Sequence, residues 1–250
     1  MRTLVAIPVF NEAASLHRVL GAVRRHTPDI LVIDDGSIDD TPHLLRQARD
    51  VCVLTHPENR GYGQSLIDAF QFAACRGYEW VITLDCDDQH EPAQLPDFFA
   101  AIREDDADVI SGSRYLRNDL RDDAPPADRR EINRLLTGVL NTVLRLDLTD
   151  SFCGFKAHRV AAMQRLALDE PGYAFPMQFW VQCAREGLRI RELAVRRIYR
   201  DASRAFPGTL DDPGARLTHY LDVLVRALHR EPLLRHAAPC DAPCPPCADA

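Results

Sequence analysis

The chain has 250 residues, of which 46% are hydrophobic and 27% are charged, and its formal net charge is −7. These fractions are ordinary for a globular protein and exclude a chain that is disordered throughout. The acidic balance argues against a nucleic-acid partner, and no apolar run approaches the roughly 18 residues that a membrane-spanning helix needs.

Short apolar runs alternate with amphipathic stretches through the first half of the chain. The runs predict buried strands at Thr3–Ile7, Ile30–Ile33, Val51–Leu54, Trp80–Leu84 and Asp108–Ile110. The stretches between them predict helices at Glu12–His26, Pro42–Asp50, Gln64–Arg76 and Pro92–Arg103. This alternation predicts an α/β fold with a doubly wound, mostly parallel sheet, in which ligands bind at the carboxyl ends of the strands.

The second half is expected to be mainly helical. Apolar residues in helical period predict a long helix at Arg129–Leu146, with its apolar stripe in the core, and a final helix at Ala215–Leu228. Between them we expect a helix near Phe175–Glu186 and a strand around Arg191–Ile198.

The cysteines favour a reduced, cytoplasmic chain. Five of the eight are scattered through apolar segments, unlike a secreted disulfide framework, and the apolar start of the chain is too short for a signal peptide. The other three, Cys240, Cys244 and Cys247, lie in the proline-rich residues 231–250, for which we expect a disordered tail. Adventitious metal binding is the alternative for this tail.

Three carboxylates directly after the fourth predicted strand give the strongest chemical signal: Asp85, Asp87 and Asp88. Crowded carboxylates repel one another, so a cation stabilises such a cluster. Hard oxygen ligands favour Mg²⁺ or Mn²⁺, which one or two carboxylates commonly share with substrate phosphates. Two alternatives are a solvated helix N-terminus and a phosphatase in which Asp85 is the nucleophile.

Polar segments also follow the first three predicted strands, at Pro8–Glu12, Asp34–Thr41 and His56–Gly63. A carboxylate in the second segment can accept hydrogen bonds from ribose hydroxyls or nucleobase N–H groups, although turn and cap formation is the alternative. Glycines in the third segment permit close backbone approach, and Arg60 has the chemistry to pair with a phosphate.

Together with Ser111-Gly112-Ser113-Arg114-Tyr115, these segments resemble a family 2 glycosyltransferase with the glycosyltransferase-A fold. Within that family the chain is most similar to the dolichyl- and polyprenyl-phosphate mannosyltransferase branch. The resemblance implies a single domain at residues 1–230, in which residues 1–115 bind the nucleotide sugar and residues 116–230 form the acceptor side.

The resemblance also implies which residues contact the nucleotide-sugar donor. They are Pro8, Phe10, Glu12, Ile33, Asp35, Arg60, Asp85, Cys86, Asp87, Arg114 and Arg204. Asp85, Asp87 and Gln89 are expected to hold the Mg²⁺ or Mn²⁺ that bridges the diphosphate. Arg114 and Arg204, with Arg197 as a second candidate, are expected to neutralise the leaving group.

The implied reaction is an inverting transfer of a hexose from a donor of the GDP-mannose or UDP-glucose type. Polyprenyl phosphate is the preferred acceptor, and a hydroxyl of a soluble glycan or small molecule is the alternative. A hydroxyl acceptor needs a carboxylate base, for which Asp150 is preferred over Asp147, whereas an ionised phosphate needs none. A turn or cap role is the alternative for Asp150.

Two further expectations concern partners. A lipid acceptor implies peripheral contact with the inner membrane face, through the helix at Arg129–Leu146 or at Ala215–Leu228. The sequence leaves the oligomeric state open, a homo-oligomer included, and a nucleotide-sugar-binding module without turnover is the non-enzymatic alternative.

Overall fold

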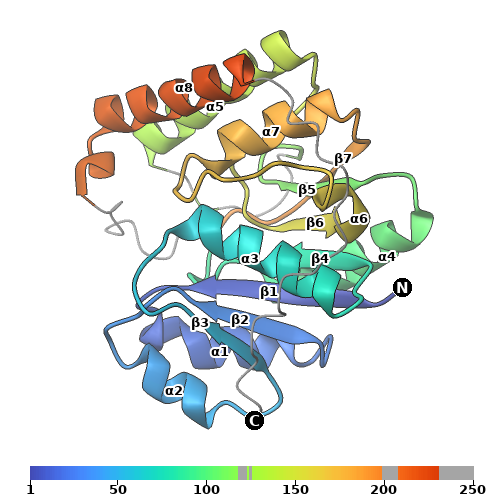
Figure 1. Ribbon diagram of the computed structural model, residues 1–250, viewed down its shortest axis with the longest axis vertical. Coiled ribbons are helices and arrows are strands. Elements are labelled where there is room, and N and C mark those ends of the chain that lie inside the picture. The colour runs from blue at the N-terminus through green and yellow to red at the C-terminus, as the bar shows by residue number, and fades with distance from the viewer. Residues whose placement is uncertain (118–122, 124–125, 199–207, 231–250) are drawn as a thin grey trace.

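A single mixed sheet forms the centre of the molecule (Figure 1). The computed structural model describes residues 1–117, 123, 126–198 and 208–230. Its strands are β1 (Thr3–Val9), β2 (Ile30–Asp34), β3 (Cys52–Thr55), β4 (Trp80–Thr83), β5 (Val109–Ser113), β6 (Lys156–Arg159) and β7 (Ile190–Ala194). They lie in the order β3-β2-β1-β4-β6-β5-β7. Only β6 is antiparallel to its neighbours among these described strands.

Helices cover both faces of the sheet, so the predicted doubly wound α/β fold is confirmed. The helices are α1 (Ala13–Val23), α2 (Thr41–Gln47), α3 (Tyr62–Cys75), α4 (Leu95–Glu104), α5 (Ala127–Leu144), α6 (Val160–Met163), α7 (Phe175–Arg185) and α8 (Pro213–His229). Short 3₁₀ turns precede α4 at Pro92–Gln94 and α8 at Gly208–Asp211.

The alternation of side chains along β1 divides the core into two layers. Val5 and Ile7 pack with α1, α2 and α4 on one face, whereas Leu4 and Ala6 pack with α3, α5, α7 and α8 on the other. Successive side chains of a strand point to opposite faces, so a strand covered on both sides must be apolar throughout. Burying each large aliphatic side chain in these layers stabilises the fold by about 1.5–3 kcal/mol.

The sequence pattern did not predict β6, which lies between β4 and β5. Its four residues include Lys156 and His158, both buried, and no apolar run marks the segment as a strand. The segment becomes a strand because β4 and β5 pair with it on both edges, and not because of its own hydrophobic pattern.

The long predicted helix forms as α5, but its apolar stripe is only partly in the core. Ile132, Leu136 and Leu140 are buried, whereas Leu135 and Val143 are 44% and 50% exposed. No helix in the described part of the chain has the length and apolarity to cross a bilayer. The predicted tail at residues 231–250 and Arg204 both lie outside the described residues.

Candidate active site

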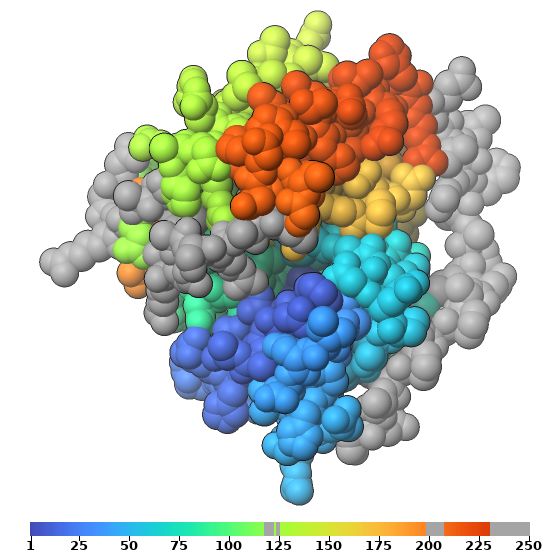
Figure 2. All heavy atoms as spheres, turned by 90° about the vertical axis from the view of Figure 1, so that its left-hand side faces the viewer, coloured from blue at the N-terminus to red at the C-terminus, as the bar shows by residue number. Residues whose placement is uncertain are grey.

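A cavity of about 680 Å³ lies at the carboxyl ends of β1, β2 and β4, where the two halves of the chain meet. In the space-filling view a hollow separates the blue and cyan N-terminal part from α5 and α8 above it (Figure 2). Nine of the expected residues line this cavity: Pro8, Phe10, Glu12, Asp35, Asp85, Cys86, Asp87, Gln89 and Arg114. The cavity therefore gathers most of the predicted donor site.

The loops after β1 and β2 hold each other in place. The Asn11 backbone N–H donates to the Ser37 hydroxyl at 2.9 Å, and the Asn11 side chain accepts from the Ile38 N–H at 2.9 Å. Asp39 accepts from the backbone N–H groups of Ala13 and Thr41 at 3.2 and 2.9 Å, so it ties the starts of α1 and α2 together, whereas Asp40 at the N-cap of α2 makes no side-chain capping bond. These bonds fix the segment that presents Pro8, Phe10 and Glu12 to the cavity.

Asp35 shapes the loop that follows β3. Its carboxylate accepts from the backbone N–H groups of Arg60 and Gly61, both at 2.8 Å, and from His56 Nδ1 at 2.6 Å. The Arg60 side chain is 47% exposed and lies 3.5 Å from Asp68, and neither it nor the buried Ile33 is among the described residues that line the cavity. The backbone of Arg60, rather than its guanidinium, is therefore what the structure ties to the site.

Asp85 is held by three neighbours. The Tyr62 hydroxyl donates to Asp85 Oδ1 at 2.9 Å, and the Asp85 backbone N–H donates to His90 Nδ1 at 3.1 Å. A Cβ atom at Gly154 would lie 2.2 Å from Asp85 Oδ2, so only glycine leaves room for this carboxylate. The acidic segment is thus positioned by residues from both halves of the chain.

Burial sets the protonation of the two aromatic partners of this segment. It lowers the pKa of His90 to about 4, so the ring is neutral at physiological pH and Nδ1 accepts the Asp85 N–H. Burial, followed by the charge of Asp85, raises the pKa of the Tyr62 hydroxyl, which therefore stays a hydrogen-bond donor. Tyr62 also stacks on Tyr173, with ring centroids 6.0 Å apart. Both tyrosines line the cavity, and neither was predicted from the sequence as a site residue.

The remaining residues of the acidic segment differ in role. Asp87 lines the cavity, and its Oδ1 accepts from the Gln89 N–H at 3.0 Å. Asp88 adopts a left-handed φ of 61° and pairs with Arg18 on α1. Burial, then the charge of Glu12, raises the pKa of the Cys86 thiol to about 12, which leaves it unreactive.

The oxygen donors around the cavity suit a hard divalent cation. Asp85 and Asp87 supply carboxylates and Gln89 an amide oxygen, and Gly154 leaves space beside the first of them. Within the described residues no group of three or more His, Cys, Asp or Glu side chains is placed to hold a metal ion. A cation here would complete its coordination with donor phosphates, as magnesium commonly does.

Arg114 is fixed by Asp150 from behind the cavity. Its Nε and Nη2 donate to the two Asp150 oxygens at 2.7 and 3.0 Å, and Asn133 donates to Oδ1 at 2.8 Å. Burial alone would raise the pKa of Asp150, but the charge of Arg114 and the hydrogen bonds from Arg114 and Asn133 together outweigh it and lower the pKa to about 2. Asp150 is fully buried and is not one of the described residues that line the cavity.

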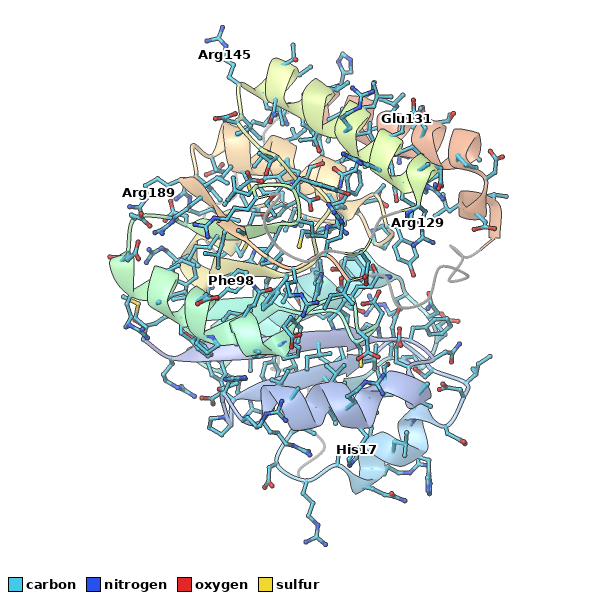
Figure 3. All side chains as sticks on the ribbon, turned by 180° about the vertical axis from the view of Figure 1, so that it is seen from behind. His17, Phe98, Arg129, Glu131, Arg145 and Arg189 are labelled. Atoms are coloured by element: carbon cyan, nitrogen blue, oxygen red, sulfur yellow. The ribbon has the colours of Figure 1, made fainter. Side chains whose placement is uncertain are left out.

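The second half contributes a wall of the cavity whose individual residues were not predicted from the sequence. Its lining residues are Arg129, Ile132, Asn133, Phe152, Gly154, Tyr173, Pro176, Arg216 and Tyr220. Arg129 lies on the inner side of α5, whereas Glu131 and Arg145 point away from the molecule (Figure 3). Arg216 is 2% exposed and donates to the Leu210 carbonyl at 2.9 Å. Their spacing from the apolar stripe, Arg129 three residues before Ile132 and Arg216 four before Tyr220, is the signal that could have found them.

Comparison with known proteins decides the family. Residues 4–167 match the family described as glycosyl transferase family 2. The chain belongs to this family. It is therefore a glycosyltransferase, which replaces both the phosphatase alternative and the binding module without turnover.

Two curated relatives cover most of this glycosyltransferase. An undecaprenyl-phosphate mannosyltransferase of Micrococcus luteus is 34% identical over 80% of the chain and 85% of its own length. A polyprenol monophosphomannose synthase of Mycolicibacterium smegmatis is 28% identical over 78% of the chain and 76% of its own length. The resemblance to the polyprenyl-phosphate mannosyltransferase branch is thereby confirmed.

A solved structure confirms the glycosyltransferase-A fold. Glucosyl-3-phosphoglycerate synthase of Mycobacterium tuberculosis, crystallised with Mn²⁺, UDP and glucosyl-3-phosphoglycerate, superposes with a TM-score of 0.68. The match covers 91% of the glycosyltransferase and 80% of that chain, at 19% identity.

Proposed function

We propose that this glycosyltransferase moves a hexose, with inversion, from a nucleotide sugar of the GDP-mannose or UDP-glucose type to polyprenyl phosphate. The observation that carries the proposal is that one side of the cavity is acidic and the other side is basic and apolar. Asp85 and Asp87 lie on one side, and Arg129 and Arg216 with apolar side chains lie on the other. The names of the two curated relatives described above support the same acceptor class.

On the donor side, Asp85, Asp87 and Gln89 would hold Mg²⁺ or Mn²⁺. When bound, the cation would neutralise charge on the departing nucleoside diphosphate. Pro8, Phe10, Glu12 and Asp35 would bind the nucleoside, because they line the cavity next to the acidic segment. Roles for the Arg60 side chain and for Arg204 at the diphosphate remain predictions.

Arg114 is the cation that the described structure places most firmly in the cavity. Its contact with both oxygens of buried Asp150 fixes the plane of the guanidinium. A fixed positive charge beside the developing negative charge of the transition state needs no reorganisation during the reaction. We therefore assign Asp150 to positioning Arg114, in place of the base that was expected from sequence.

The acceptor side suits a phosphate on an apolar chain. Arg129 and Arg216, the second of which is paired with Asp128, bring guanidinium groups to this wall, and Ile132, Phe152 and Tyr220 supply apolar surface along it. An acceptor phosphate oxygen would form the new bond to the anomeric carbon as the bond from that carbon to the diphosphate breaks. An ionised phosphate has no proton to lose, so this transfer needs no carboxylate base.

A lipid acceptor also requires the glycosyltransferase to reach a bilayer. Leu135 and Val143 on α5 and Val225 on α8 are exposed apolar residues, and α5 packs beside α8. Exposed Arg130 and Arg134 lie on the same helix as the first two. Apolar side chains with arginines around them favour peripheral contact with an anionic membrane face, which is where we place this cytoplasmic enzyme.

A transfer assay tests the proposal. The purified protein is incubated with labelled GDP-mannose or UDP-glucose, polyprenyl phosphate in detergent, and Mn²⁺, Mg²⁺ or a chelator. We expect an organic-extractable labelled product with one donor, formed with metal and lost with chelator. Transfer only to a water-soluble hydroxyl acceptor would instead support the alternative acceptor class.

A further inference from the structure

We call the side of the cavity lined by Pro8, Phe10, Glu12, Asp35, Asn59, Gly61, Asp85 and Asp87 the donor wall. A buried histidine behind this wall has no part in the chemistry described so far. His56 follows β3 and is 4% exposed. Its Nδ1 lies 2.6 Å from Asp35 Oδ1 and its Nε2 lies 2.9 Å from Asp68 Oδ2 on α3. The ring therefore bridges two carboxylates that come from different elements of the fold.

The two contacts of the ring fit its doubly protonated form. An ionised carboxylate accepts hydrogen bonds and donates none, so between two ionised carboxylates both ring nitrogens carry a proton. The charged groups that face this arrangement in the described residues are Asp35 from the end of β2, Asp68 from α3 and, across Asp68 at 3.5 Å, Arg60. The hydrogen bonds that the ring donates to Asp35 and Asp68 raise the pKa of His56 to about 9, despite burial.

Asp35 passes this constraint on to the cavity. Besides His56, the backbone N–H groups of Arg60 and Gly61 donate to its carboxylate. Gly36 and the Glu58–Asn59 backbone lie so close that a Cβ at Gly36 would be 2.4 Å from the Glu58 carbonyl carbon. Asn59, Gly61 and Asp35 all line the cavity, so the position of one carboxylate sets the shape of this wall.

We propose that His56, in its doubly protonated form, is a positioning residue that holds Asp35 and the Asn59–Gly61 loop in the geometry that binds the donor nucleotide. The inference rests on the proposed function, because it assigns this wall to the donor. His56 itself does not touch the donor and takes no part in bond formation.

Two variants separate the two hydrogen bonds of the ring. The side-chain amide of His56→Asn replaces Nδ1 and keeps a donor toward Asp35, whereas that of His56→Gln replaces Nε2 and keeps a donor toward Asp68. We expect the donor Kd and KM to rise about tenfold in His56→Gln and about threefold in His56→Asn, with kcat little changed. The matched control is His17→Gln, an exposed position on α1, which should leave both constants unchanged (Figure 3).

The charge is measured directly on the wild-type protein without donor. Imidazole nitrogen NMR should show both His56 nitrogens protonated at pH 8, and Asp68→Asn should move the titration to lower pH. As the pH rises, donor binding should weaken at a lower pH in Asp68→Asn than in the wild type. This loss would then occur below the pH at which the nucleobase itself loses a proton, so the two effects can be separated.

The possible failures are distinguishable. A wild-type protein that binds no nucleotide sugar overturns the proposed function, while the NMR result still tests the charge. A neutral His56 at pH 8, equal donor Kd in wild type and His56→Gln, or a loss of kcat at unchanged KM would each overturn the positioning role. If the variants do not fold, the NMR titration and Asp68→Asn decide the matter.

Discussion

The two walls of the cavity are built differently. The donor wall consists of loops that begin where β1, β2, β3 and β4 end, so each side chain is placed by the strand that precedes it. The acceptor wall consists of side chains on α5, α7 and α8 and the loops between them, which reach the cavity only through packing of helices on the sheet.

This difference separates the part of the site that local sequence fixes from the part that tertiary packing fixes. It also predicts how each part fails. A change in the acidic segment should remove one chemical step and leave the fold intact. A change at a contact between the halves should alter stability and activity together.

The largest effect is expected for Asp87→Asn. The loss of one carboxylate charge should lower transfer by about a thousandfold or more, because the cation would no longer be held next to the diphosphate. Calorimetry should show that Mn²⁺ no longer strengthens binding of the nucleoside diphosphate. The matched control is Asp88→Asn, since Asp88 pairs with Arg18 and is not a lining residue of the described cavity. Binding that still depends on Mn²⁺ in Asp87→Asn would exclude Asp87 as a ligand.

Asp150→Asn should affect both the fold and the reaction. The substitution leaves Arg114 without its buried counter-charge, so we expect the free energy of unfolding to fall by about 3 kcal/mol. Transfer should fall by about a hundredfold as the guanidinium loses its orientation. Denaturant unfolding and steady-state kinetics measure the two effects, with exposed Asp147→Asn as control. An Asp150→Asn protein that keeps its full stability but has lost all transfer would instead indicate that Asp150 is a catalytic base.

The same ion pair predicts a pH dependence of stability. The folded pKa of Asp150 is about 2 and lies below that of an unfolded aspartate. The pair therefore stabilises the protein above about pH 4, by about 2 kcal/mol, and this contribution is lost as the pH falls toward 2. In Asp150→Asn, unfolding measured over that range should lack this component.

A smaller effect is expected for Gly154→Ala. The added methyl group would lie 2.2 Å from Asp85 Oδ2, so the carboxylate must move. We expect Mn²⁺-dependent donor binding to weaken about tenfold, because displaced ligands bind metal less well. Gly138→Ala on α5 is the control, since nothing lies within 4 Å of its new Cβ, and it should stabilise the helix by about 0.5–1 kcal/mol. Equal Mn²⁺ dependence in both variants would show that Asp85 needs no such space.

The smallest effect is expected for removal of residues 231–250. A chain that ends at Arg230 should keep its turnover within about twofold, because we assign the whole reaction to residues 1–230. Parallel transfer assays on the full and shortened chains measure this. A large loss would give the segment that contains Cys240, Cys244 and Cys247 a functional role.

The gathering of the residues that follow β1, β2 and β4 at one cavity was predictable from the sequence for a physical reason. Strands buried on both faces are continuous apolar runs, and whatever follows them lies at one edge of the sheet. The acidic segment after Trp80–Thr83 can therefore be assigned to this edge of the sheet from the sequence alone, before any contact is known. In the same way the fold class follows from the alternation of strands and helices.

The sequence fails where position depends on partners distant along the chain. β6 has buried Lys156 and His158 and becomes a strand because β4 and β5 pair with it. The sequence also gives no sign that Arg114 donates to both oxygens of Asp150, which is the contact on which we base a positioning role for it. Arg216 is charged and yet buried, and only the packing of α8 brings it to the cavity.

Diffraction at the manganese absorption edge, from crystals grown with Mn²⁺ and a nucleoside diphosphate, tests the central claim most directly. We expect one anomalous peak, at a manganese ion coordinated by Asp87 or Asp85 and by the diphosphate. The nucleoside should contact Asp35, and Arg114 should lie on the opposite side of the phosphates. A nucleotide bound outside this cavity, or a manganese ion that touches neither aspartate, would contradict it.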